Sequence, residues 1–316
     1  MTWPSYEDLP HHGVTGEAVS WEAFGAEDEL GTVNFMTPGS VREAAAYIRD
    51  GSVFPLNLPL DYLDPPLFRR APVRRVMVRT SSGTDDYYDS FYPQSASQWD
   101  GLSHICHQDV GYYNGRSDRD VTDPANPRNG IEHWAGTGIA GRFVLADIAR
   151  LRAETGRPTD FDHPEPTTAG ELEAALARSE TATRPGDVLL LRFGWLEWYG
   201  ALPAERRQEL SARFHFPAPG LSPERATARW LWDHRILAVA ADTPTLEAMP
   251  FDKGSFDGFL HYRLIPMLGM PVGELFALDS LASACARDGR YAGFFTAAPL
   301  NFRGGSGSTA NALAIR

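Results

Sequence analysis

Residues 98–107 read QWDGLSHICH, and this stretch decides more about the chain than any other. Asp100 and His104 are four residues apart, so on one helical turn or in a tight loop their side chains converge on one point. A second imidazole, His107, follows at once, and aromatic residues flank the cluster on both sides. Carboxylate and imidazole groups gathered in this way can hold a divalent metal ion. The stretch therefore favours a metal site, and a metal site makes the protein a candidate hydrolase.

Other motifs follow in a fixed order along the chain. They are DELGTVNF at 28–35, the stretch 98–115, GIAGRFVLAD at 138–147, RPGDVLL at 184–190, FPAPGLS at 216–222, His261 with Glu274, and GGSGS at 304–308. From about Trp21 to the C-terminus, this order resembles the putative cyclase family of metal-dependent hydrolases, which is related to bacterial kynurenine formamidase and isatin hydrolase. The resemblance is greatest to the long actinobacterial branch with the pattern Gln-Trp-Asp-x-Leu-x-His. It implies an α/β, swivelling β/β/α cyclase-like fold with a mixed β-sheet core and flanking helices, assembled at least as a dimer.

The central motif departs from the form carried by better-known branches of that family. Their motif is H-x-G-T-H-x-D-x-P-x-H, in which the first two His and the Asp bind metal and the last His transfers protons. The second His falls on His104, whereas the first falls on Asp100, which can still coordinate a metal. The family Asp falls on Cys106, which is either a thiolate ligand or a small buried residue. The last His falls on Val110, so the proton-transfer role must move or be absent.

The family also has a His and a Glu about a dozen residues apart, and His261 and Glu274 match that pair. The resemblance implies metal binding by Asp100, His104 and His261, with His261 and Glu274 as catalytic groups. For the proton-transfer role lost at Val110, His107, Tyr112 and Tyr113 are within reach, and we take His107 as the third catalytic candidate. Alternatively, His261 is a hydrogen-bonded core histidine and Glu274 a helix cap. Groups that could orient ligands or substrate are Gln98, Trp99, Tyr112, Tyr113 and Asn114.

The predicted function is metal-dependent hydrolysis of a carbon–nitrogen or ester bond. The substrate would be a ring-bearing small molecule, either a cyclic amide, imide or lactone that is opened or an aryl formamide that is cleaved. One divalent ion per chain, Mn²⁺ or Zn²⁺, would supply a bound hydroxide as nucleophile. Two alternatives remain open: a metal-free acid–base dehydratase or cyclase, and a non-catalytic small-molecule binding protein on the same scaffold.

Composition excludes several other classes of protein. The 316 residues include 41 Asp and Glu against 29 Lys and Arg, and the charges are scattered, which argues against nucleic-acid binding. No apolar run approaches the ~20 residues needed to span a bilayer. Two cysteines, Cys106 and Cys285, suit a reducing compartment, and no signal peptide is visible. We therefore expect a cytoplasmic protein without nucleic-acid or membrane partners. The family resemblance implies a homodimer or homotetramer.

The chain shows no composition break, so we expect a single domain over 1–316 with an N-terminal arm over about 1–20. Short β-branched or apolar runs predict buried strands at 53–58, 74–79, 143–148, 188–192, 236–241 and 293–296. Helices are predicted at 41–49, at 172–178 after a capping box from Thr168 to Glu171, and after Ser222-Pro223-Glu224. Long irregular connections are predicted at 60–72, 81–103, 115–135 and 197–219, and loops of that length are usually functional.

Overall fold

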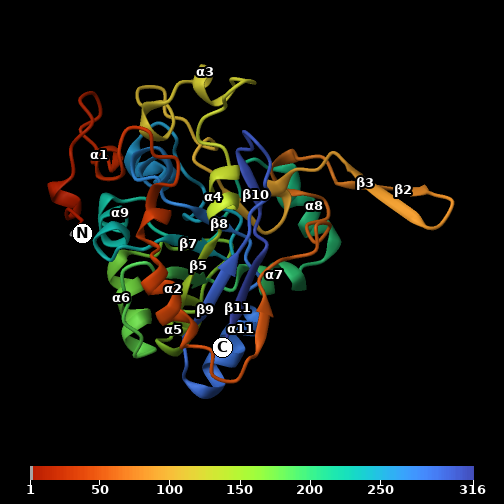
Figure 1. The fold of residues 1–316 in the computed structure, drawn as a ribbon. Helices are drawn as coiled ribbons and strands as arrows, with labels where there is room; N and C mark the ends of the chain where they lie inside the picture. Colours follow the sequence, from red (N-terminus) through yellow and green to blue (C-terminus); the bar gives the residue numbers. More distant parts are fainter. Residues whose placement is uncertain (1–2) are drawn as a thin grey trace.

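A computed structural model describes residues 3–316, and its centre is a mixed nine-stranded sheet (Figure 1). Strands β5 to β8 are parallel neighbours, while the strands on both sides of them pair antiparallel. The predicted α/β fold with a mixed sheet is confirmed. In spatial order the strands are β1 (Val53–Pro55), β11 (Ala312–Ile315), β9 (Ala292–Ala297), β5 (Ile139–Asp147), β6 (Val188–Arg192), β7 (Ala238–Ala241), β8 (Val272–Glu274), β4 (Gln98–Asp100) and β10 (Gly307–Thr309).

The central strands are apolar along their whole length because both of their faces are covered. In β6, Leu189 and Leu191 belong to one hydrophobic cluster, whereas Val188 and Leu190 belong to a second cluster on the opposite face. Parallel strands covered on both faces read as near-continuous hydrophobic runs, which is why this strand was recognisable from sequence.

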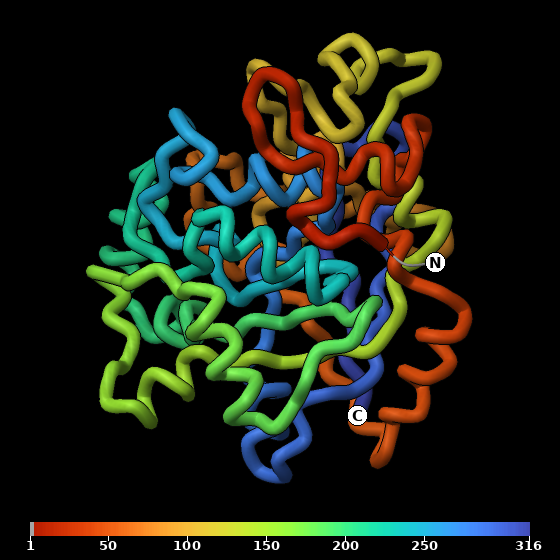
Figure 2. The backbone as a smooth tube through the Cα atoms, turned by 90° about the vertical axis from the view of Figure 1, so that its left-hand side faces the viewer, coloured from red at the N-terminus to blue at the C-terminus, as the bar shows by residue number. Residues whose placement is uncertain are grey.

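Helices cover both faces of the sheet, as Figures 1 and 2 show. Leu172 of α6 and Trp232 of α9 pack in the cluster with Leu189, whereas Leu281 of α11 packs in the cluster with Leu190. No helix within residues 3–316 has the length and apolar character required to cross a membrane. The helices are α1 (Trp21–Phe24), α2 (Pro38–Ala45), α3 (Asp118–Val121), α4 (Glu132–Thr137), α5 (Ile148–Glu154), α6 (Ala169–Arg178), α7 (Trp195–Ala201), α8 (Ala204–Ala212), α9 (Arg225–Asp233), α10 (Leu260–Tyr262) and α11 (Asp279–Asp288).

The starts of two helices test the N-caps predicted from the sequence. The Thr168 hydroxyl accepts a hydrogen bond from the Glu171 backbone N–H, so the predicted N-cap of α6 is confirmed. The helix expected directly after Ser222 instead begins at Arg225, and Ser222 Oγ accepts from the Glu224 backbone in the preceding turn. The N-terminal segment passes over α9, where the Tyr6 N–H donates to Asp233 (Figure 2).

A hairpin of β2 (Arg74–Arg79) and β3 (Thr84–Asp89) projects from the body of the molecule (Figure 1). The strand at 74–79 is correctly predicted, but its burial is not, because the hairpin forms a separate two-stranded sheet that is almost wholly exposed. Three of the predicted irregular connections are also corrected. The segment 81–103 contains β3 and β4, the segment 115–135 contains α3, and the segment 197–219 contains α8.

Candidate metal centre

The sheet places two carboxylates on one face of two neighbouring antiparallel strands, diagonally across from each other. Successive side chains of a strand point to opposite faces, so Gln98 and Asp100 of β4 share a face while Trp99 points into the core. Gln98 lies directly opposite Glu274 of the antiparallel strand β8, and its side-chain amide donates to the Glu274 carboxylate. Between these polar residues, Gly273 is required because a Cβ there would lie 2.5 Å from the Ala240 side chain on β7. The alternation polar–apolar–polar of QWD thus delivers Asp100 to the same face as Glu274.

A short helical turn supplies the imidazole. His261 lies in α10 and is buried, with the Phe259 ring stacked on it at 4.9 Å between centroids. Its Nδ1 lies 2.8 and 2.7 Å from the two carboxylate oxygens of Glu247, which is fully buried. A carboxylate at one ring nitrogen fixes the tautomer and turns the other nitrogen, Nε2, toward a ligand. Glu247 therefore positions His261 as such carboxylates do in many metal sites.

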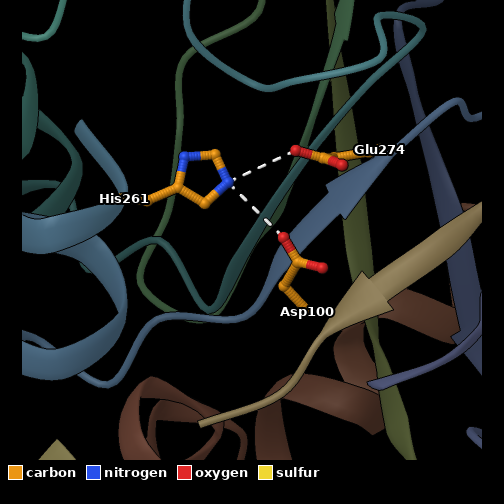
Figure 3. Close-up of side chains that lie close together, drawn as sticks. All are labelled: Asp100, His261 and Glu274. Atoms are coloured by element: carbon orange, nitrogen blue, oxygen red, sulfur yellow. Dashed lines mark ion pairs between the residues drawn. The ribbon is translucent and has the colours of Figure 1, made fainter. Parts of the chain in front are cut away.

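Asp100, His261 and Glu274 come together at one point (Figure 3). His261 Nε2 lies 3.4 Å from Asp100 Oδ2 and 3.3 Å from Glu274 Oε1. Ligand atoms held ~2.1 Å from a tetrahedral ion are about 3.4 Å apart, which matches these separations. The other oxygen of this carboxylate, Asp100 Oδ1, is buried, accepts no hydrogen bond from the described residues and lies 3.5 Å from His104 Nε2. The residues therefore fit a divalent metal.

The electrostatics of the three groups also indicate a missing positive charge. Burial and the neighbouring Asp100 carboxylate raise the pKa of Glu274 to about 7. Burial also acts to raise the pKa of Asp100, but His104 and His261 outweigh it and hold that pKa below its usual value. Burial acts to lower the pKa of His261, yet Glu247, Asp100 and Glu274 together raise it well above 6.5. Asp100 and Glu274 repel each other when both are ionised, and a divalent cation bound between them would offset that repulsion.

His104 lies beside this group but not within it. It follows β4 in a tight turn, and its Nε2 is 3.5 Å from Asp100 Oδ1. Burial lowers its pKa, so the imidazole is neutral near pH 7 even though Asp100 acts in the opposite direction. His104 lines a cavity of about 120 Å³ together with Asp100, His261 and Glu274. The expected convergence of Asp100 and His104 in a loop is what the structure shows.

The structure places the other predicted site residues away from this cavity. His107 packs its ring on Phe256 and Tyr262, and its Nδ1 accepts from the Asp109 backbone. Cys106 is exposed, so the expectation of a small buried residue there is wrong.

The two tyrosines that follow Cys106, Tyr112 and Tyr113, form hydrogen bonds within the fold and do not line the cavity. Tyr113 is buried and donates to Asp28, Tyr112 donates to Asp118, and the Asn114 amide donates to the Gly25 and Asp28 carbonyls. Trp99 donates to the Ala310 carbonyl within the core. Of the five residues expected to orient ligands or substrate, only Gln98 contacts the trio directly.

Sequence reasoning missed two kinds of residue that belong to this site. Glu247 stands in the segment after β7, far from any motif, and only the fold brings it to His261. Arg70 and Phe68, from the irregular segment 60–72, line the cavity, as does Phe214 from the segment 197–219. The length of those two segments was the only signal that they serve the site.

The model of the family described as putative cyclase matches residues 55–248, more than half of the chain. The chain belongs to this cyclase family. A solved structure described as a novel cyclase is 30% identical, with a TM-score of 0.82 over 94% of this chain and 99% of that one. The family assignment made from the motif order is thereby confirmed. No curated protein matches the sequence.

More distant relatives share the fold of this cyclase-family protein. Isatin hydrolase A from Labrenzia aggregata, bound to benzyl benzoate, is 18% identical, with a TM-score of 0.58 over 86% of this chain and 94% of that one. An isatin hydrolase bound to the product analogue thioisatinate is 16% identical, with a TM-score of 0.61 over 88% of this chain and 98% of that one. At these identities the likeness shows the fold alone.

Proposed function

We propose that this cyclase-family protein is a metal-dependent hydrolase that opens a cyclic amide, imide or lactone, or cleaves an aryl formamide. One observation carries the proposal: Asp100, His261 and Glu274 meet, buried, at the separations of metal ligands, and Glu247 orients the histidine. Hydrolases among the structural neighbours support the same class of chemistry.

In this proposal Asp100, His261 and Glu274 hold one Mn²⁺ or Zn²⁺, since both ions accept carboxylate and imidazole ligands. A divalent ion bound there polarises a carbonyl oxygen and lowers the pKa of a water molecule to about 7. The chain's own residues provide the rest. Glu247 keeps His261 in the tautomer that presents Nε2, and the Gln98 amide holds the Glu274 carboxylate in place.

We assign proton transfer to His104 rather than to His107. The neutral His104 imidazole lines the cavity beside Asp100, so it can take a proton from the attacking water and return it to the leaving nitrogen or oxygen. His107 is not among the residues that line this cavity, and aromatic rings cover its imidazole. The direct metal-ligand role predicted for His104 is thereby replaced by an adjacent one.

Elemental analysis of the purified protein tests the proposal, with the variants His261→Ala and His104→Ala beside the parent. We expect about one Mn or Zn per chain in the parent and in His104→Ala, and loss of the metal in His261→Ala. His163→Ala is a matched control, because His163 lies in an exposed segment remote from the trio. Absence of metal from the parent after incubation with Mn²⁺ and Zn²⁺ would favour metal-free acid–base chemistry or a binding protein.

We also propose that the expected homodimer forms through the projecting hairpin of β2 and β3. The hairpin exposes the side chains of Met77, Val78, Tyr87 and Tyr88. An isolated two-stranded hairpin is only marginally stable in water. Contact with a second copy would cover these side chains. Cytoplasmic location stays a prediction, consistent with the two free cysteines, Cys106 and Cys285.

A further inference from the structure

The cavity beside the proposed metal ligands has a lining suited to a ring. Its volume of about 120 Å³ is close to that of an engineered cavity of ~150 Å³ that takes up benzene. Its lining includes four phenylalanine rings and two cationic side chains. These residues are Phe68, Phe214, Phe251, Phe259, Arg70 and Lys253.

We propose that the substrate is a single-ring aromatic compound bearing an anionic substituent, which Arg70 and Lys253 bind while the reacting carbonyl faces Asp100 and His104. This inference rests on the proposed hydrolase function and narrows its substrate class.

Arg70 is a half-buried guanidinium with unused donors. Its Nη1 donates to the Gln94 carbonyl, and the guanidinium carbon lies 5.2 Å from the centre of the Phe68 ring. Among the described residues Arg70 forms no ion pair, although a guanidinium offers five N–H donors. Burial lowers its pKa, while Glu274 and Asp100 partly offset that effect. A cation that is partly removed from water without a carboxylate in contact is costly unless a ligand supplies the anion.

Lys253 is the one lysine in a chain with 28 arginines. Its ammonium lies 4.8 Å from the centre of the Phe259 ring and 5.4 Å from that of Phe251. Phe259 in turn stacks on His261, and Lys253 is among the residues that line the cavity. Cation–π contact fixes the position of the ammonium and leaves its three N–H donors available for a carboxylate or sulfonate.

The test compares an anion and its neutral isostere, benzenesulfonate and methyl phenyl sulfone, by calorimetry on the metal-loaded full chain. Sulfonate is a weak metal ligand, so its binding reports on the cations. We expect Arg70→Gln and Lys253→Met each to weaken benzenesulfonate about ten-fold or more while sulfone affinity changes less than two-fold. Arg70→Lys should recover part of the loss. Arg74→Gln, on the exposed hairpin, is the matched control.

Chemical modification gives a second readout that needs no turnover. Reductive methylation with formaldehyde modifies only Lys253 and the N-terminal amine, and the latter serves as internal reference. Benzenesulfonate should slow modification of Lys253 relative to the N-terminus. Equal protection by methyl phenyl sulfone, or unchanged sulfonate affinity in Arg70→Gln and Lys253→Met, would overturn the inference.

Substrate pairs then separate this inference from the function on which it rests. The parent should prefer 4-formamidobenzoate over formanilide by about ten-fold in kcat/KM, mostly through KM, and Arg70→Gln should abolish the preference. If the protein hydrolyses both compounds equally well, the anion subsite is refuted and the proposed hydrolase function stands. Sulfonate discrimination in a protein that neither retains metal nor hydrolyses any compound refutes the proposed function alone.

Discussion

Replacing Glu247 by Gln should weaken metal binding without removing a single metal ligand. Both Glu247 oxygens lie within 2.8 Å of His261 Nδ1, and the carboxylate is completely buried. Glutamine keeps one acceptor for the Nδ1–H but removes the negative charge that makes the imidazole a stronger donor to the metal.

The size of the effect follows from the change in hydrogen bond. A hydrogen bond to a charged group contributes about 1.5–3 kcal/mol, against about 1 kcal/mol for a neutral one. Loss of a partner behind a metal-bound histidine typically costs 10–100-fold in affinity, or about 1.4–2.7 kcal/mol. We therefore expect the metal dissociation constant of Glu247→Gln to rise by about 10–100-fold.

Competition with a chelating fluorescent indicator measures this constant directly. Glu171→Gln is a suitable control, because Glu171 is also a largely buried carboxylate but pairs with Arg152 on another face of the molecule. The control should lower the free energy of unfolding and leave metal affinity intact. A Glu247→Gln protein that is folded and binds metal as tightly as the parent would refute the role given to Glu247.

Three further predictions follow from the site and the hairpin. Removing the imidazole in His104→Ala should leave the metal content at that of the parent and lower kcat by about 10²–10⁴-fold, because a proton carrier is lost; loss of the metal would make His104 a ligand instead. Carboxylate neighbours raise the pKa of His261, so the metal-free imidazole is protonated near pH 7 and releases a proton when the metal binds. Metal affinity should therefore rise with pH, by up to ten-fold per unit, until the pH reaches that raised pKa. Indicator titrations at pH 6, 7 and 8 measure this increase. Replacing residues 74–89 by a short Gly-Ser turn should convert a dimer into a monomer by light scattering, and a parent that is already monomeric contradicts the proposed association.

The central sheet could be predicted because strands that are buried on both faces consist almost entirely of apolar residues. Strand β6 coincides with the predicted run at 188–192, and β5 begins four residues before its predicted start. The three-residue strands β4 and β8 could not be predicted in the same way, since pairing with neighbours, and not hydrophobic pattern, defines them. The hairpin strand β2 shows the converse, because its apolar residues predicted burial that the isolated hairpin does not provide.

The candidate site was predictable only where its residues lie inside a motif. Asp100 is in the QWD run, and the resemblance to the family singled out His261 and Glu274, so all three members of the trio were named from sequence. Aromatic residues beside the motif misled, since Tyr113 is occupied by Asp28 in the core rather than by a ligand. Glu247 and Arg70 carry no local signal, because each becomes part of the site only through the fold: Glu247 by its contact with His261, and Arg70 by its position near Glu274.

The departures from the family motif make sense once the ligands are assigned to elements. Asp100 and Glu274 stand on adjacent antiparallel strands, and the ladder itself fixes their separation; His261 comes from a helical turn locked by Glu247. Cys106 lies in the exposed turn beyond β4 and is not one of the residues that come together in the trio. The proposed metal ligands lie on strands and a helical turn, whereas Arg70 and Lys253 come from irregular segments that line the cavity. Under the proposed function, changes in those segments would alter the choice of substrate and leave the metal ligands in place.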